Sequence, residues 1–404
     1  MIGANVLTKG LGLLAVVFVT RMTTEGQYGA YAFAMNLVGA AVPFMGFGAY
    51  QAFLRFSTTV EGQHAKRELY RYAFARGAMF SLILIGALNL AAEHLCQAIP
   101  ESVASFRIVS FVVLTTLVME HVKSYARAIH RNHISARIDM TYAFTLVSLT
   151  VGLTWHFGIV GYAGAVALSP LVAAIPFARM MQLGVWAWGQ LDRRIEGFWS
   201  YGIFTTVGAL LAKLFYTVDI YLIGQYVGEN ASAVAVYRVA ILIPMATSIL
   251  PIAVAATDYV KNAGNKDDAQ ALKTYVINYW KTFGFLSAAV LGLLALLAPW
   301  LLGVFGPNYV EGAAVMRIFL LGSLGAHLLR VPFGHLLSAV GRADWNTYVH
   351  ALVLLTTVAS CMWAIPQWGI LGAATAMSCM IWLSGLLSVL MFGLHLQRQQ
   401  AKPM

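Results

Sequence analysis

Two lysines stand in the middle of apolar stretches, at corresponding places in the two halves of the chain. Lys9 lies within residues 1–20 and Lys213 within residues 201–227. A lysine at bilayer depth costs at least about 2.5–3.5 kcal/mol, so we expect it to face a wet cavity or a partner. Two such cations favour an anionic ligand, for example one that carries phosphate. The alternative is that each lysine pairs with a buried carboxylate or carbonyl, or extends its ammonium to an interface.

Three arginines extend this candidate cationic site. Arg21 follows the first apolar stretch, Arg55 follows the second, and Arg238 lies several residues inside the eighth. For Arg55, anchoring at the membrane surface is the ordinary explanation. We predict that these three arginines line a substrate-binding cavity together with Lys9 and Lys213.

One carboxylate, Asp219, lies well inside an apolar stretch, and it is the best candidate for coupling to an ion. Asp219 and Arg238 lie at similar depths on neighbouring stretches, so the simpler interpretation is an ion pair between them. The alternative is that Asp219 takes up a proton or a sodium ion and releases Arg238 for the cargo. His327 is a second candidate because histidine titrates near physiological pH, although such a residue more often packs through hydrogen bonds.

Motifs for enzymatic or metal chemistry are missing from the sequence. Cys96, Cys361 and Cys379 form no CxxC or Cys/His cluster, so we expect neither a metal site nor a cofactor. No hydrolase elbow or phosphate-binding loop occurs, so we do not expect an enzyme. Coupling to H⁺, to Na⁺ or to the membrane potential stays open.

The composition places these residues in a membrane. Hydrophobic residues make up 60% of the chain and charged residues 10%, whereas soluble domains average about 25% charged residues. The formal charge of +10 is typical of cytoplasmic anchoring, and we expect no nucleic-acid partner.

The apolar stretches predict an all-α polytopic membrane protein with about twelve transmembrane helices. A helix needs about 20 apolar residues to cross the bilayer. The predicted spans are residues 1–20, 30–52, 74–92, 103–122, 140–157, 160–177, 201–227, 232–257, 279–305, 313–337, 348–365 and 370–395.

Charge alternates between the connecting loops, which predicts their orientation. One set of loops carries most of the arginines and lysines, for example around residues 55–72 and 122–139. The positive-inside rule places this set and both termini in the cytoplasm. Arg21 is the exception, because it lies at the outer end of the first span.

The two halves of the chain repeat each other. GIVG at residues 158–161 matches GILG at residues 369–372 at an offset of 211, and Lys9 matches Lys213 at 204. Six spans in each half make the repeats parallel, so two bundles would face each other around a central cavity. The predicted parts are an N-terminal bundle (1–183), a cytoplasmic linker (184–199), a C-terminal bundle (200–396) and a cytoplasmic tail (397–404).

The opening of the chain resembles a known transporter family. Residues 21–31 read RMTTEGQYGAY, and residues 47–56 read FGAYQAFLRF. An arginine at the end of the first helix, a Tyr-Gly-x-Tyr stretch and a later Arg-Phe are similar to the polysaccharide-biosynthesis flippases, which belong to the multidrug/oligosaccharidyl-lipid/polysaccharide (MOP) exporter superfamily. Arg21 and Arg55 match cationic positions of that pattern.

The resemblance implies that an undecaprenyl-pyrophosphate-linked oligosaccharide moves across the bacterial inner membrane by alternating access. The cargo would be an O-antigen, capsule or exopolysaccharide unit. Its head would occupy a cationic cavity and its lipid tail a groove outside, and the polysaccharide polymerase machinery would be a partner. Lipid II flippases of the superfamily usually carry two further C-terminal helices, and their absence from this sequence favours the polysaccharide branch.

Two other functions are weighed against this one. A multidrug extruder of the same fold needs acidic or aromatic cavities for cationic drugs, whereas this chain has one deep carboxylate against several deep cations. A membrane polysaccharide polymerase or ligase needs a reactive site, often on a large outer loop, and the outer loops here are short. We expect a monomer, because one chain would enclose its own cavity.

Overall fold

The computed structural model describes residues 2–184, 195–227, 231–266 and 268–400. Within these ranges the chain forms helices and turns and no strand. Packing divides the chain into two compact units. Unit 1 comprises Met1–Thr217 and Gly228–Ala235, and unit 2 comprises Val218–Val227 and Val236–Met404.

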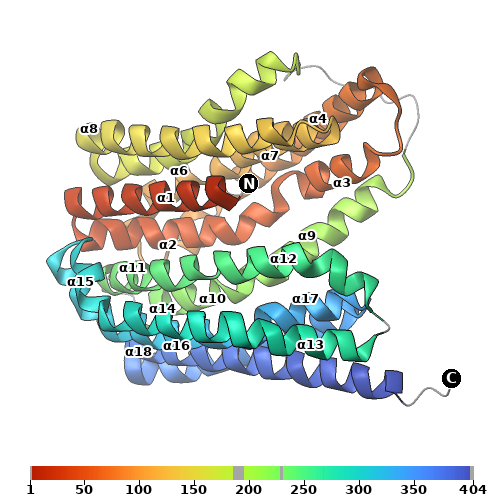
Figure 1. Cartoon of the computed structure of the whole chain (residues 1–404). Helices are drawn as coiled ribbons and strands as arrows, with labels where there is room; N and C mark the ends of the chain where they lie inside the picture. Colours follow the sequence, from red (N-terminus) through yellow and green to blue (C-terminus); the bar gives the residue numbers. More distant parts are fainter. Residues whose placement is uncertain (1, 185–194, 228–230, 267, 401–404) are drawn as a thin grey trace. The chain divides into compact units, whose positions relative to one another are not determined.

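Unit 1 is built from helices of very different length (Figure 1). They are α1 (Ile2–Met22), α2 (Glu25–Ala41), the 3-10 helix η1 (Val42–Gly48), α3 (Ala49–Phe56), α4 (Gly62–Leu90), α5 (Ala92–Leu95), α6 (Ser102–Val109), α7 (Val112–Ala128), α8 (Asn132–Met180) and α9 (Phe198–Phe215). The first residues of α11 (Ala231–Thr247) also belong to this unit.

Unit 2 contains the rest of α11 and the remaining helices. They are α10 (Val218–Tyr226), α12 (Ile249–Gly264), α13 (Ala269–Tyr279), the π-helix η2 (Trp280–Gly284), α14 (Phe285–Leu296), α15 (Ala298–Gly303), the 3-10 helix η3 (Pro307–Gly312), α16 (Ala313–Gly325), the π-helix η4 (Ala326–Arg330), α17 (Val331–Ala339) and α18 (Ala343–Gln400).

The predicted class, an all-helical multi-pass membrane protein, is confirmed. Nine continuous helical runs among the described residues are long and apolar enough to cross a membrane. Each of the predicted spans overlaps a helix, and α8 and α18 contain two predicted spans each. The number of membrane crossings stays a prediction.

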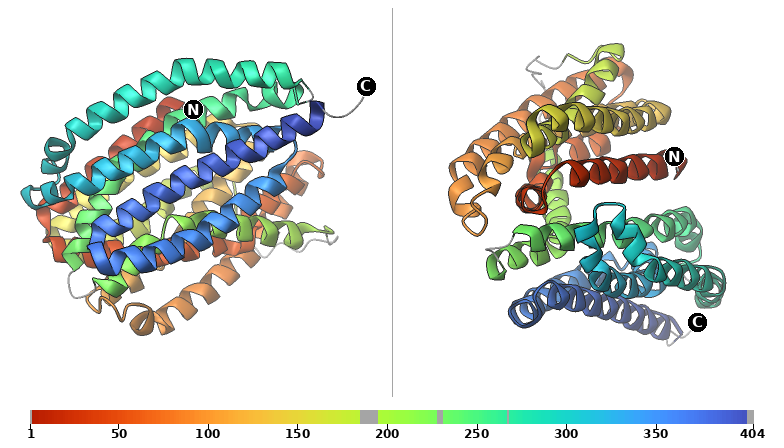
Figure 2. Two further views of the ribbon diagram at one scale, coloured as in Figure 1. Left: turned by 90° about the horizontal axis from the view of Figure 1, so that it is seen from below. Right: turned by 90° about the vertical axis from the view of Figure 1, so that its left-hand side faces the viewer.

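Helices α8 and α18 each reverse direction at a glycine, as the two further views show (Figure 2). Gly158 has φ 59° and ψ −140°, and Gly369 has φ 55° and ψ −134°. A Cβ on Gly161 would lie 2.0 Å from the backbone oxygen of Leu153. Residues eight positions apart on one continuous helix are separated by about 12 Å, so the chain turns back between these two residues. In α18, a Cβ added to the glycine three positions after Gly369 would likewise lie 2.2 Å from a backbone oxygen eight residues earlier. The predicted match between GIVG and GILG is therefore also a match of backbone conformation.

The second predicted span is interrupted at η1. Pro43 is the second residue of η1, and Gly46 and Phe47 have positive φ angles of 59° and 46°. The backbone N–H of Gly46 donates to Ser81 Oγ at 3.0 Å, which satisfies a group that the break releases from the helix.

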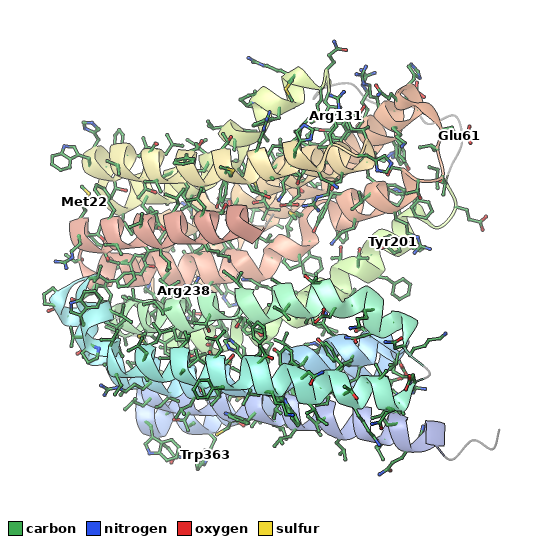
Figure 3. All side chains as sticks on the ribbon, in the orientation of Figure 1. Met22, Glu61, Arg131, Tyr201, Arg238 and Trp363 are labelled. Atoms are coloured by element: carbon green, nitrogen blue, oxygen red, sulfur yellow. The ribbon has the colours of Figure 1, made fainter. Side chains whose placement is uncertain are left out.

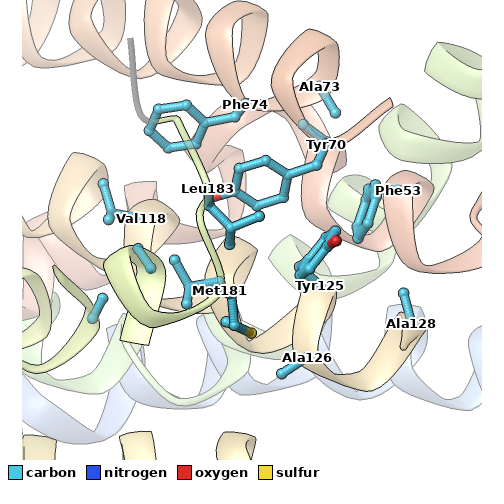
Figure 4. Packing of buried hydrophobic residues seen from close by; sticks show 14 of the residues in the cluster. Phe53, Tyr70, Ala73, Phe74, Val118, Tyr125, Ala126, Ala128, Met181 and Leu183 are labelled. Carbon is cyan, nitrogen blue, oxygen red and sulfur yellow. The ribbon is translucent and has the colours of Figure 1, made fainter. Parts of the chain in front are cut away.

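An aromatic cluster forms the core of unit 1 at one end of its helices (Figure 4). Tyr70 and Phe74 of α4 stack with their ring centroids 6.0 Å apart and their planes at 2°. Phe53 of α3 meets Tyr70 edge-on at 5.9 Å, and Tyr125 of α7 completes the cluster. All four rings are buried, so this cluster holds α3, α4 and α7 together.

The predicted boundary between the two bundles does not coincide with the packing units. Most of the predicted linker, residues 184–199, lies outside the described residues, including Arg193 and Arg194. Helix α9, predicted to open the C-terminal bundle, packs against η1 and α3 of unit 1. Packing and sequence repeat are different criteria, so the bundle boundaries at 183 and 200 stay a prediction.

Candidate functional site

Lys213 lies in the last turn of α9, with its side chain against α2. A Cβ built on Gly39 of α2 would come within 3.3 Å of Lys213 Cε and 3.5 Å of Lys213 Nζ. The missing side chain at Gly39 therefore provides the space that the lysine occupies. A cation at a helix C-terminus is also favoured by the helix dipole.

Arg55 lies at the opposite end of α9 from Lys213. Its guanidinium carbon lies 4.3 Å from the centroid of the Tyr201 ring and 5.6 Å from that of Phe56. Such cation–π contacts orient a guanidinium without neutralising it. The sequence identified Arg55 but did not identify Tyr201, labelled in Figure 3, as its partner.

The cations of unit 1 are spread along the helices. Lys9 and Arg21 both lie on α1, twelve residues and thus about 18 Å apart. Along α9, Lys213 also lies twelve residues, and thus about 18 Å, from Tyr201, the residue whose ring contacts Arg55. Arg238 belongs to unit 2. A single cavity lined by all five cations therefore stays a prediction.

The alternation of charge between the loops stays a prediction. Glu61 and Arg131 lie toward one end of the unit, and Met22, at the end of α1, lies at the other (Figure 3). Which end faces the cytoplasm stays a prediction. Arg21 lies one residue before Met22 and is exposed.

The seventh predicted span is discontinuous. Helix α9 ends at Phe215, and α10 begins at Val218. The break is hydrogen-bonded: the Thr217 hydroxyl lies 3.2 Å from the backbone oxygen of Lys213, and Asn36 Nδ2 donates to the Thr217 carbonyl at 2.8 Å. Discontinuous membrane helices with satisfied breaks are common at the ion and substrate sites of transporters.

Asp219 lies directly after this break, in the first turn of α10, and only 1% of it is exposed. Its Oδ2 accepts a hydrogen bond from the Tyr237 hydroxyl at 2.7 Å, and its Oδ1 accepts one from the Ile220 N–H at 2.8 Å. The predicted ion pair with Arg238 is wrong: Arg238 influences the carboxylate electrostatically, but the contact is made by the neighbouring Tyr237. A carboxylate and a phenol in a dry site can hold a proton, or contribute oxygen ligands to a small cation.

His327 lies in η4 and is 4% exposed. Its Nε2 lies 3.3 Å from Thr247 Oγ1, and its Nδ1 lies 3.3 Å from Ser287 Oγ. Because both ring nitrogens have partners, the contacts favour the packing interpretation of this residue. Its part in ion coupling stays a prediction.

A buried ion triad in unit 1 was missed by the sequence analysis. Lys123 Nζ lies 2.7 Å from Glu120 Oε1 and 2.7 Å from Asp139 Oδ1. Lys123 is 7% exposed, so it is a buried residue of α7 although it belongs to the basic segment around residues 122–139. Only the spacing of Glu120 and Lys123, one helical turn apart, could have indicated the first of the two pairs.

The geometry can now be compared with known proteins. The model of the family described as polysaccharide biosynthesis protein matches residues 1–258. The chain belongs to this family. The match includes α1, α2 and the segment from η1 to Arg55, from which the resemblance was inferred.

Two curated relatives match about half of the chain. The teichuronic acid biosynthesis protein TuaB of Bacillus subtilis is 27% identical over 204 residues, which is 50% of this chain and 40% of TuaB. A putative O-antigen transporter of Shigella flexneri is 24% identical over 236 residues, which is 54% of this chain and 55% of that protein. The chain thus spans about half the length of the relatives it matches.

Two solved structures share the fold over nearly the whole chain. The lipid II flippase MurJ in an inward closed conformation aligns with a TM-score of 0.77 and 13% identity, over 98% of this chain and 88% of MurJ. A MATE multidrug resistance transporter in an inward-facing conformation aligns with a TM-score of 0.78 and 14% identity, over 98% of this chain and 96% of that protein. Both structures belong to transporters of small or lipid-linked molecules, and the likeness shows the fold alone.

Proposed function

We propose that this protein is a flippase for a lipid-linked oligosaccharide. The cargo is an undecaprenyl-pyrophosphate-linked O-antigen, capsule or exopolysaccharide unit, which moves across the bacterial inner membrane. The observation that carries the proposal is the family match over residues 1–258. The named relatives act in teichuronic acid and O-antigen pathways, which supports a saccharide cargo.

The charges around α9 support an anionic head group. Arg55 is exposed and is held by an aromatic ring, so its N–H groups are available for bidentate contacts with phosphate. Lys213 follows about 18 Å further along the same helix. Asp219, in contrast, is buried and hydrogen-bonded through both oxygens, which makes it a poor site for a cationic drug.

The proposed mechanism is alternating access of the two bundles, residues 1–183 and 200–396, with both termini in the cytoplasm. The pyrophosphate binds to the cations from the cytoplasmic leaflet and is released outside. Transport is driven by the membrane potential, or by H⁺ or Na⁺ taken up at Asp219, and it needs no cofactor. The protein acts as a monomer that delivers units to the polysaccharide polymerase machinery.

A multidrug extruder of the same fold is the second candidate, because the fold is shared with MATE transporters. The family match and the scarcity of accessible deep carboxylates favour the flippase. A polymerase or ligase ranks third, since the solved structures that share the fold are those of transporters and flippases.

Leaflet-resolved transport in proteoliposomes tests the proposal. The probe is the lipid-linked oligosaccharide purified from the cells that make this protein, and a cationic dye is tested in parallel. We expect glycolipid transport by the wild type and its loss in Lys9→Ala/Lys213→Ala. The control is Lys273→Ala, which removes an exposed lysine of α13.

Two outcomes would overturn parts of the proposal. Dye efflux without glycolipid movement would identify a multidrug extruder. Native transport by Lys9→Ala/Lys213→Ala would leave the flippase standing but would remove these two lysines from its binding site.

A further inference from the structure

A polar pocket of about 640 Å³ lies within unit 2, between α12 on one side and α13 and η2 on the other. This volume lies within the range of about 300–1,000 Å³ that is typical of small-molecule sites. None of the cations and carboxylates discussed above lines the pocket. Most of its lining residues lie between positions 258 and 277, and the lysines of that stretch predict that it faces the cytoplasm.

One wall of the pocket is a ladder of three aromatic rings. Tyr275, Tyr279 and Phe283 are spaced four residues apart and therefore share one face of the helix. The Tyr275 and Tyr279 centroids are 6.2 Å apart, and Tyr279 and Phe283 stack at 5.3 Å with their planes at 11°. The Tyr279 hydroxyl donates to the His327 carbonyl at 2.9 Å, which fixes the middle ring.

The opposite wall consists of short polar side chains. Asp258 and Asn262 of α12 line the same pocket as Tyr275. Asn262 is 5% exposed, so its amide is held in place. Asn278, one turn beyond Tyr275 on α13, is exposed and adds another amide to the lining. Tyr279 itself is 5% exposed, so the half-buried rings of Tyr275 and Phe283 are the ones that can present a face to a ligand, next to the polar groups of the lining.

The internal repeat shows that this arrangement is not required by the fold. Tyr70 and Phe74, which stack in unit 1, lie 205 positions before Tyr275 and Tyr279. At the same offset Phe53, which packs edge-on against Tyr70, corresponds to Asp258, which lines the pocket together with Tyr275.

The two units thus carry different chemistry at these corresponding positions. Unit 1 covers its aromatic stack with Phe53 and makes a core. Unit 2 places the carboxylate of Asp258 there and leaves a pocket. A carboxylate contributes little to the packing of an aromatic stack, so we explain the exchange by a ligand.

We propose that the pocket between α12 and α13 binds a saccharide ring. A sugar presents an apolar C–H face that stacks on aromatic rings, and a girdle of hydroxyls that amides and carboxylates bind. Two carboxylates, Asp258 and Asp268, outnumber the single cation Lys261 in the lining, which disfavours a phosphate. The proposal rests on the proposed function and deepens it, because it assigns a site to the sugar of the cargo.

Protection of an introduced cysteine tests the pocket directly. The exposed Cys379 is first replaced by serine, while Cys96 and Cys361 are buried and stay. Asn278→Cys is then labelled with a hydrophilic maleimide in the full-length protein, with and without the oligosaccharide released by mild acid from the lipid-linked units. The matched control is Lys273→Cys, on the same helix but outside the pocket.

We expect the saccharide to slow labelling of Asn278→Cys roughly tenfold at ten times its Kd, by mass action, and to leave Lys273→Cys unchanged. Adding Tyr275→Leu should abolish the protection, because it removes one ring of the ladder. Equal labelling of Asn278→Cys at every saccharide concentration up to the solubility limit would overturn the proposal.

Failure of the pocket and failure of the flippase are distinguishable. If wild-type protein moves the glycolipid but the saccharide gives no protection, only the pocket proposal fails. If the saccharide protects Asn278→Cys but no glycolipid moves, the flippase proposal fails and the pocket stands.

Discussion

Replacing Lys123 by alanine should destabilise unit 1 more than replacing any surface cation. Lys123 Nζ contacts Glu120 and Asp139 at 2.7 Å each, and it joins α7 to α8. The variant would leave two carboxylates without their shared cation in a largely buried place. Removing one partner of a buried ion pair typically costs about 3–5 kcal/mol.

The exposure of the side chains sets the expected value within that range. The Lys123 side chain is 9% exposed, but those of Glu120 and Asp139 are 20% and 25% exposed, so water screens the carboxylates in part. We therefore expect a loss of about 3 kcal/mol in the free energy of unfolding, at the lower end of the range. The matched control is Arg107→Ala: the Arg107–Glu93 pair has side chains 51% and 83% exposed, and such pairs contribute about 0–1 kcal/mol.

Unfolding in mixed micelles of a mild detergent and SDS, followed by tryptophan fluorescence, measures both variants. A double variant, Lys123→Met/Glu120→Gln, should recover part of the loss, because it removes one of the two orphaned charges. Equal stabilities for Lys123→Ala and Arg107→Ala would refute the reasoning that this triad is a buried structural element.

Four further predictions follow from the described contacts. Gly29→Ala should cost about 1–3 kcal/mol in unfolding free energy, because its Cβ would lie 1.7 Å from the Ala231 oxygen; Gly86→Ala, with open space around it, should be neutral or stabilising in the same titration. Tyr237→Phe removes a donor to the buried Asp219 and should alter how glycolipid transport depends on pH or Na⁺; an unchanged dependence would show that the Tyr237 hydrogen bond has no part in coupling. Arg55→Lys should weaken transport several-fold, measured as the initial rate, since an ammonium cannot make the bidentate contacts of a guanidinium. Burial raises the pKa of the Cys96 thiol, so the thiolate fraction, and with it the rate of maleimide labelling, should still rise steeply with pH at about pH 8.5, the usual pKa of a free thiol, where the rate of an ordinary thiol begins to level off; a rate that levels off there would contradict this.

The fold could be predicted because its signals are local in the sequence. Long apolar stretches give membrane helices whatever their neighbours. The glycines at 158 and 369 are needed where the backbone adopts a conformation that side chains do not tolerate, so the repeat was visible at these positions.

The candidate site was harder to predict because depth along a helix does not give the direction of a side chain. Tyr237 and Arg238 lie at nearly the same depth, but consecutive residues point about 100° apart around a helix. Tyr237 therefore meets Asp219 and Arg238 does not. The partners of Lys123 and Arg55 lie on other helices, at Asp139 and Tyr201, and no sequence spacing encodes such contacts.

The reversals at Gly158 and Gly369 also have a consequence for biogenesis. Each reversal is a turn without charged residues. The two apolar helices that it joins already touch each other next to the turn. Such a turn offers the insertion machinery no hydrophilic loop to translocate separately. The two helices of α8, and likewise those of α18, should therefore enter the bilayer together as a preformed hairpin rather than one after the other.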